Sequence, residues 1–172
     1  MSINRQQLLA DDALRPIGKG KPPSSYIGKM FMYNYDPKHK KTLPYWDEWP
    51  LIFFTDVWKS EKTGVSGWAG INLHYLPPTV RIKLFLKLLE TTTNKTLKDD
   101  TKLQINYGIL KSVSKLSMFK PCYKRYLPNH LQSQIVEVPA PEWEIAVVLP
   151  FQKFHGASSQ YVWTKSILGK GF

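Results

Sequence analysis

The sequence predicts an α+β protein: a small, strongly bent antiparallel sheet or barrel with one central helix and extended terminal arms. Aromatic residues crowd residues 28–78, and prolines and glycines divide this stretch into short pieces. Such a composition is typical of short strands joined by tight turns. A helical apolar pattern follows directly, over residues 80–91. The terminal segments, in contrast, are expected to add little to the core.

Length and composition favour one domain. The chain has 172 residues, a net charge of +11 and a single cysteine, Cys122, which excludes an internal disulfide and fits a reducing compartment. No secretory leader is visible, and no apolar run is long enough to span a membrane. We expect an extended basic arm over residues 1–28, one α+β domain over residues 29–165 and a tail over residues 166–172. The protein is expected to be soluble and cytoplasmic, or assembled in the cytoplasm.

Strand patterns cover residues 29–35, 51–58, 68–75 and 135–138. Residues 101–116 fit both periods, and we favour a strand that passes into a short helix near residues 109–116. The later segments are expected to be irregular or extended: residues 143–149 are β-prone at their end, and the segment from Ser158 is interpreted as a surface extension.

The central helix is predicted to start at Pro77-Pro78-Thr79, with threonine as its cap. Its apolar residues form two ridges: Ile82, Phe85, Leu86 and Leu89 on one, and Val80, Leu84 and Leu88 on the other. We expect this helix and residues 28–78 to share one core. Four side chains are predicted to be buried there: Trp49, Trp68, Phe85 and Leu89.

The positive charge is unevenly distributed. Lys and Arg exceed Asp and Glu by 8 in residues 79–130 and by 3 in residues 1–29. Residues 30–78 and 131–172 carry no net charge. A basic face of this kind binds phosphates or docks onto an acidic protein, or it is simply a solvated surface. The cations expected to face DNA or an acidic partner are Lys19, Lys21, Lys38, Lys40, Lys41, Arg81, Lys83, Lys87, Lys120, Lys124 and Arg125.

Two segments combine cations with aromatic rings, which is the composition of a base-stacking platform. One is residues 120–126; the other is Tyr35 with the basic tip at residues 38–41. Half-buried tyrosines at the edge of a core are the alternative interpretation. No signature of a recognition helix or an RNA-binding sheet appears, so the sequence does not support sequence-specific readout.

No catalytic residue, metal site or cofactor is predicted, and no small-molecule substrate. The histidines His39, His74, His130 and His155 are far apart in the sequence, and the nearest soft pair, Cys122 and His130, has nothing to complete a metal site. Neighbouring acids on a strand point apart, so Asp47 and Glu48 are expected to cap a turn. A hydrogen-bonded strand histidine is favoured for His74. A nuclease or hydrolase that uses Asp47 or His74 is the enzymatic alternative.

Four stretches carry a resemblance to known proteins: YDPKHKKTLPYWDEWPLIF, GWAGINLHYLPPTVRIKLFLKLL, CYKRYL and EWEIAVVLPFQKF. Together they resemble a family of small proteins of contractile-tailed, T-even-like bacteriophages, labelled DNA-end protectors or virion structural proteins. The similarity spans roughly residues 26–165. It implies a component of the virion that is assembled in the host cytoplasm.

The leading expectation is therefore a non-enzymatic structural protein of the phage neck, tail or baseplate. It would dock to other virion proteins and turn its basic face toward DNA or an acidic partner, with any DNA contact independent of sequence. The alternative is a DNA-end-binding protector that is carried with the packaged genome.

Overall fold

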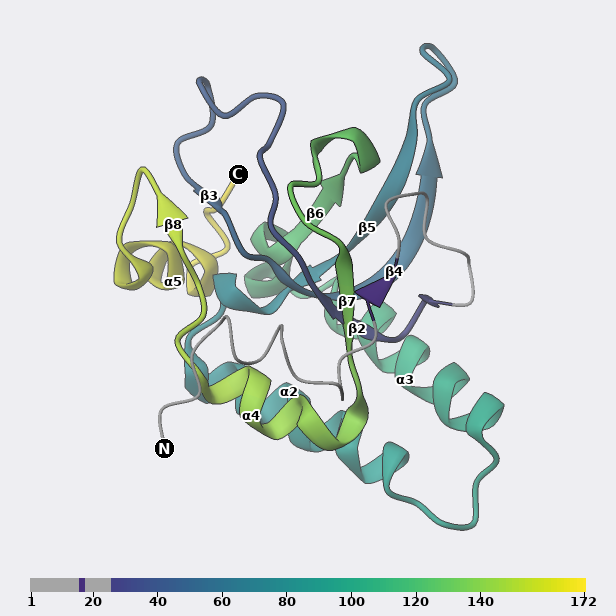
Figure 1. Cartoon of the computed structure of the whole chain (residues 1–172). Coiled ribbons are helices and arrows are strands. Elements are labelled where there is room, and N and C mark those ends of the chain that lie inside the picture. Colours follow the sequence, from purple (N-terminus) through teal and green to yellow (C-terminus); the bar gives the residue numbers. More distant parts are fainter. Residues whose placement is uncertain (1–15, 18–25) are drawn as a thin grey trace.

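An antiparallel sheet organises the computed structural model, which describes residues 16–17 and 26–172 (Figure 1). Its six strands run in the order β1-β7-β2-β4-β5-β6, and β1 and β6 are the two edges among the described residues, so the sheet stays open and is not a barrel. The strands are β1 (Pro16–Ile17), β2 (Met30–Met32), β4 (Leu51–Lys59), β5 (Ser66–Asn72), β6 (Tyr123–Tyr126) and β7 (Ile135–Val138). A separate pair joins β3 (Trp46–Asp47) to β8 (Phe154–His155).

More than one helix packs around the sheet, which corrects the expectation of a single central helix. Figure 1 shows α2, α3 and α4 together on one side of the sheet, and α5 beside β8. The helices are α2 (Pro78–Thr92), α3 (Asp99–Val113), α4 (Trp143–Val148) and α5 (Ser159–Ile167). Short 3-10 turns connect the elements: η2 (Leu73–Tyr75), η3 (Ser117–Cys122), η4 (Pro128–His130) and η5 (Ala140–Glu142).

Strand alternation builds two hydrophobic clusters, one on each face of the sheet, because successive side chains of a strand point to opposite faces. Met30 and Met32 belong to the cluster under the helices, and Phe31 between them belongs to the other. Phe85 lies in the helix-side cluster, whereas Trp68 lies in the opposite one. The shared core expected for residues 28–78 and α2 is the helix-side cluster, which contains Met30, Phe53 and Phe85. Trp68 lies in a second cluster, because the central strands are buried on both faces.

Of the four side chains expected to be buried, Trp68 and Phe85 are buried. Leu89 is half-buried against the helix-side cluster, and Trp49 is also only half-buried. Helix α2 begins at Pro78, before the predicted Thr79 cap. Its buried positions are Arg81, Leu84, Phe85 and Leu88. Leu86, expected on the same apolar ridge as Phe85, is 52% exposed.

A β-bulge interrupts β4. The register with β5 shifts between Phe54, which pairs with Gly70, and Asp56, which pairs with Ala69, so Thr55 is the extra residue. Beyond the bulge, Asp56 turns to the helix side. There it accepts hydrogen bonds from Lys111 of α3 at 2.8 Å and from the Tyr123 hydroxyl at 2.8 Å. The bulge thus ties α3 and β6 to the middle of the sheet.

The C-terminal half contains more helix than predicted. Residues 99–113 form one continuous helix without a preceding strand, and the segment from Ser159 is helix α5. Residues 143–148 form α4 although they are β-prone, because the helix buries Trp143, Ala146 and Val147 against α2. Tertiary packing overrides local propensity here. The Ser158 hydroxyl caps α5 by accepting a hydrogen bond from the Tyr161 amide.

Candidate nucleic-acid interface

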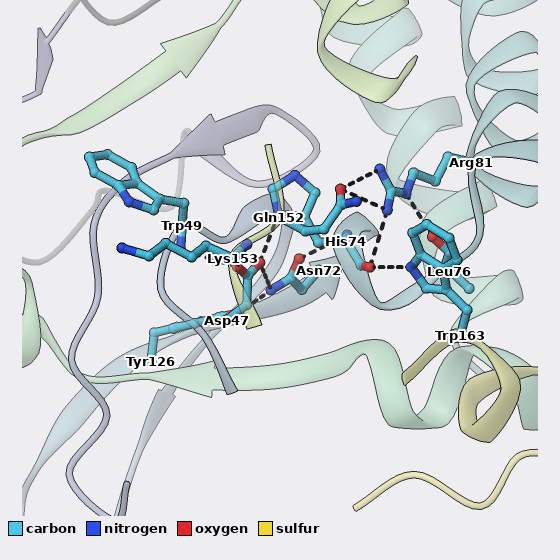
Figure 2. A network of polar contacts seen from close by, with 10 residues as sticks. All are labelled: Asp47, Trp49, Asn72, His74, Leu76, Arg81, Tyr126, Gln152, Lys153 and Trp163. Carbon is cyan, nitrogen blue, oxygen red and sulfur yellow. Dashed lines mark hydrogen bonds and ion pairs between the residues drawn. The ribbon is translucent and has the colours of Figure 1, made fainter. Parts of the chain in front are cut away.

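A buried polar network centres on Asp47 and joins β3 to β5, η2 and the segment before β8 (Figure 2). One carboxylate oxygen, Oδ2, lies 2.7 Å from His74 Nδ1 and accepts a hydrogen bond from Asn72 Nδ2 at 3.2 Å. The other oxygen accepts hydrogen bonds from the amides of Trp49 and Lys153, both at 3.1 Å. The carboxylate is therefore fully used inside the protein.

The charge of Asp47 is stabilised by these partners. Burial alone raises the pKa of a carboxyl group, but the charge and hydrogen bond of His74 and the two backbone N–H groups outweigh burial here. The pKa of Asp47 is consequently lowered, and the group is ionised at neutral pH. The bond from the Trp49 amide, two residues further on, is the turn-capping contact expected from the sequence. The same carboxylate also links four segments of the fold.

Arg81 was expected to face DNA or an acidic partner, and the structure places it inside the protein instead. Its guanidinium donates to the carbonyls of Leu76 at 2.7 Å and His74 at 3.2 Å, and to Gln152 Oε1 at 3.3 Å (Figure 2). The side chain is 1% exposed and packs 5.6 Å from the Trp163 ring. Burial lowers its pKa to about 10, so it stays charged at neutral pH. Arg81 occupies the inward ridge of α2, which explains why it is buried.

His74 and Asp47 are the residues of the enzymatic alternative. Their side chains are 0% and 1% exposed, and His74 lies in η2 and not on a strand. Glu48 points elsewhere and pairs with Lys153 at 2.9 Å and His155 at 2.6 Å. Within residues 16–17 and 26–172, no three His, Cys, Asp or Glu side chains gather closely enough to hold a metal ion. In the same residues, no helix is long and apolar enough to cross a bilayer.

A pocket of about 310 Å³ opens next to this network. Asp47 and Asn72 reach its inner wall, and Asn72 also donates a hydrogen bond to the Tyr126 hydroxyl at 3.2 Å. Segments that are far apart in the sequence contribute its aromatic lining, which comprises Tyr35, Trp46, Trp58, Tyr75, Tyr126 and Phe172. The basic lining consists of Lys38, Lys124 and Arg125, with His39 beside them.

Lys124 is the cation of the pocket that contacts two aromatic rings. Its ammonium group donates to the main-chain oxygen of Phe172 at 2.6 Å and lies 3.9 Å from the Phe172 ring and 4.6 Å from the Tyr75 ring. Burial lowers its pKa to about 8. Arg125, the next residue, is exposed and holds its guanidinium 5.6 Å from the Trp58 ring. Both cations thus already contact aromatic faces.

The predicted cations are therefore only partly brought together. The pocket gathers Lys38, Lys124 and Arg125, so the two basic aromatic segments singled out in the sequence meet at one place. Lys40 and Lys41 lie in the same loop as Lys38, where Lys40 pairs with Asp36 at 2.7 Å. Both are exposed and outside the pocket lining, as are Lys83, Lys87 and Lys120. Lys19 and Lys21 lie outside the described residues.

Sequence reasoning missed Trp46 and Trp58 as lining residues. Trp46 stacks on His155 with ring centroids 4.3 Å apart, and Trp58 donates a hydrogen bond to the Trp68 carbonyl at 3.1 Å. The cation that contacts Trp58 is Arg125 of β6, which reaches it only through the fold. In the structure both rings are only half-buried, and this exposure marks them as lining residues.

Together the fold and the pocket define an α+β protein with a cavity that is both basic and aromatic. The family model described as phage T4 terminal DNA protecting protein matches residues 11–169, and the chain belongs to this bacteriophage family. The match confirms the resemblance to DNA-end protectors of T-even-like phages. No curated protein and no solved structure matches the chain.

Proposed function

We propose that the protein binds the ends of linear phage DNA and shields them, and that it does so without enzymatic activity. The observation that carries this proposal is the pocket in which Lys38, Lys124 and Arg125 surround aromatic faces. Aromatic rings beside cations are the usual means of holding bases and phosphates together. Membership of the terminal DNA protecting family supports DNA as the partner.

Charge favours this partner over an acidic or neutral ligand. Asp47 is the acidic residue in the pocket lining, and its carboxylate is committed to four hydrogen bonds inside the protein. The net charge of +11 adds a long-range attraction toward phosphates. The pocket is therefore open to an anion without a competing acid at its rim.

Protection without catalysis follows from the burial of the two enzymatic candidates. His74 and Asp47 bond each other inside the protein, and all the hydrogen bonds of the Asp47 carboxylate are to other groups of the protein, which leaves it no free lone pair to act as a base. Occupation of the DNA end would then be the whole mechanism: a nuclease that needs a free end finds it covered. Incubation of the protein with linear DNA and Mg²⁺ or Mn²⁺ should leave the DNA intact. Degradation that disappears in His74→Ala would contradict this part of the proposal.

A second role, docking to other virion proteins, is favoured by the outer face of α2. Leu86 is 52% exposed there, and Lys83 and Lys87 are exposed beside it. An apolar side chain flanked by cations suits an acidic, partly apolar protein surface. We propose that this face holds the protein in the particle, assembled in the host cytoplasm, while the pocket holds the DNA end.

The test is protection of linear duplex DNA from an exonuclease. Wild-type protein should protect linear DNA, and closed circles should compete poorly for it. Binding should weaken with salt, with a log–log slope of about −0.9 per neutralised phosphate. The double variant Lys38→Glu, Arg125→Glu should lose protection, because both side chains are exposed at the pocket.

The matched control is Lys83→Glu, Lys87→Glu, which makes the same change of charge on α2, away from the pocket lining. It should keep most of the protection and should instead weaken incorporation into particles. Equal loss of protection in both double variants would show that charge alone is at work and that the pocket is not the site. Equal competition by closed circles would contradict end binding.

A further inference from the structure

We propose that the pocket takes one unpaired nucleotide at the end of a DNA strand, with its base against the aromatic walls and its phosphate on Lys38 and Arg125. This proposal rests on the proposed DNA-end binding and names the part of the end that is recognised. It follows from the size of the pocket, the chemistry of its walls and the cost of exposing a base elsewhere in a duplex.

The size of the pocket selects a single nucleotide. Its volume of about 310 Å³ lies at the lower end of the range for small-molecule sites, about 300–1,000 Å³. A base with its sugar fits a space of this order. A duplex cannot enter, since its major groove alone is about 12 Å wide. Only a nucleotide that leaves the helix can reach the inner wall at Asn72.

The walls offer ring faces and few free polar groups. The Tyr35 hydroxyl accepts a hydrogen bond from the Leu127 amide at 3.1 Å, and the Tyr126 hydroxyl accepts one from Asn72. The Trp58 indole N–H is bonded to the Trp68 carbonyl. Because these polar atoms are already bonded, the rings are held in place. Tyr35 and Tyr126 are buried, so the half-buried rings of Trp46 and Trp58 offer the stacking contact. Stacking accepts any base, which suits a protein that must bind ends of any sequence.

The rim supplies the phosphate contact next to the stacked base. Lys38 comes from the loop before β3 and Arg125 from β6, so the cations approach the opening from two different segments. Arg125 already lies over Trp58, and the N–H groups at the edge of its planar guanidinium can donate to phosphate oxygens. A nucleotide combines a flat apolar ring system with an adjacent anion, and the pocket combines the two complementary surfaces.

Selectivity for ends follows without any reading of sequence. An interior base must be unpaired and unstacked before it can enter a pocket, and this has a free-energy cost that an already unpaired terminal nucleotide avoids. The same pocket therefore binds overhanging or frayed ends more tightly than continuous duplex. Stacking of one base in the pocket should favour ends that carry an unpaired nucleotide by about 5- to 150-fold.

The experiment uses the full chain and duplexes that contain the fluorescent base 2-aminopurine, whose emission is quenched on stacking against an aromatic ring. The base is placed as a one-nucleotide 3′ overhang, as a one-nucleotide 5′ overhang, or in the interior of the duplex. We expect quenching at one or both overhangs and none at the interior position. The overhang that is quenched identifies the strand polarity that the pocket takes.

The variant Leu43→Trp fills the pocket from its lining and leaves every cation in place. It should abolish the preference for overhangs, measured as the ratio of affinities, and it should keep the salt-dependent affinity for duplex. Circular dichroism and the unfolding midpoint establish that it is folded. If it is not, the comparison of the three probe positions in wild-type protein is sufficient by itself.

The outcomes separate the two proposals. Tight binding of linear DNA with no quenching at either overhang overturns the nucleotide pocket and leaves end protection standing. A preference for overhangs that persists in folded Leu43→Trp also overturns it, because the end would then be recognised elsewhere. Failure to bind DNA of any form overturns the proposed function, and the nucleotide pocket with it.

Discussion

The Nδ1 atom of His74 lies 2.7 Å from Oδ2 of Asp47, and neither side chain is more than 1% exposed. This contact joins η2, at the end of the central hairpin, to the small β3–β8 sheet. Asn72 donates hydrogen bonds to both Asp47 and the Tyr126 hydroxyl. The buried network around Asp47 therefore also supports the inner wall of the pocket.

Replacing Asp47 should destabilise the fold strongly. Removal of one partner from a buried charged pair typically costs about 3–5 kcal/mol, since the remaining donors lose their acceptor. We therefore expect Asp47→Asn to lower the free energy of unfolding in urea by that amount. The matched control is Asp36→Asn, which breaks an exposed pair with Lys40 and should change stability by about 1 kcal/mol or less. Similar losses in both variants would contradict the structural role of Asp47.

The same carboxylate should make the protein sensitive to acid. Burial opposes ionisation of Asp47, Glu48 and Asp56, but hydrogen bonds and charges outweigh it and lower all three pKa values. A lowered folded-state pKa contributes stability above the unfolded value, which is lost as pH falls through the folded-state pKa. Urea midpoints measured from pH 7 downward should thus fall below about pH 4. The fall should be shallower in Asp47→Asn; an identical profile would assign the acid sensitivity to other groups.

Lys124 should make DNA binding depend on pH in the alkaline direction. Burial places its pKa at about 8, so its positive charge is lost as pH rises from 7 to 9. With this pKa the protonated fraction of Lys124 falls about tenfold between pH 7 and pH 9, so affinity for linear DNA should fall by up to about tenfold over this range. Lys124→Ala should bind more weakly at pH 7 and lose the dependence. Lys120→Ala, an exposed lysine outside the pocket lining, should retain it.

The cluster on the other face of the sheet makes a separate prediction. Trp68 donates its indole N–H to the Tyr33 hydroxyl at 2.9 Å, and both residues are completely buried. Tyr33→Phe leaves this donor without its acceptor, which typically costs about 1–3 kcal/mol. Tyr161→Phe removes a hydroxyl from a side chain that is 51% exposed and should be nearly neutral. Equal unfolding midpoints for the two variants would show that water replaces the lost partner.

Much of the sheet was predictable because its signals are local. Strand β4 and strand β7 carry runs of β-branched and aromatic residues, and the helix after Pro77-Pro78 carries an apolar period. Residues 143–148 were not predictable in this way, since Ile145, Val147 and Val148 favour a strand. They form a helix only because α2 offers a surface for Trp143 and Val147.

The site was predictable in composition and not in geometry. The two basic aromatic segments were visible in the sequence, and Lys38 and Arg125 do meet at the pocket. Arg81 was misplaced because a cation on a helix is usually solvated. Only the fold reveals that the carbonyls of His74 and Leu76 stand beside α2 and need donors. Trp46 joins the pocket through the pairing of β3 with β8, a contact between segments more than one hundred residues apart.

The bulge at Thr55 determines where the central hairpin tolerates a change in length. Phe54 and Asp56 now lie on opposite faces, as adjacent residues of a regular strand do. Deletion of Thr55 would leave all the remaining side chains of β4 on their present faces. Phe54 would stay buried, and Asp56 would stay beside Lys111. Deletion of Phe53 or Ile52 would instead turn one end of the strand over. Family members of different length in this hairpin should therefore differ at this one residue and keep the same order of inward and outward side chains on either side of it.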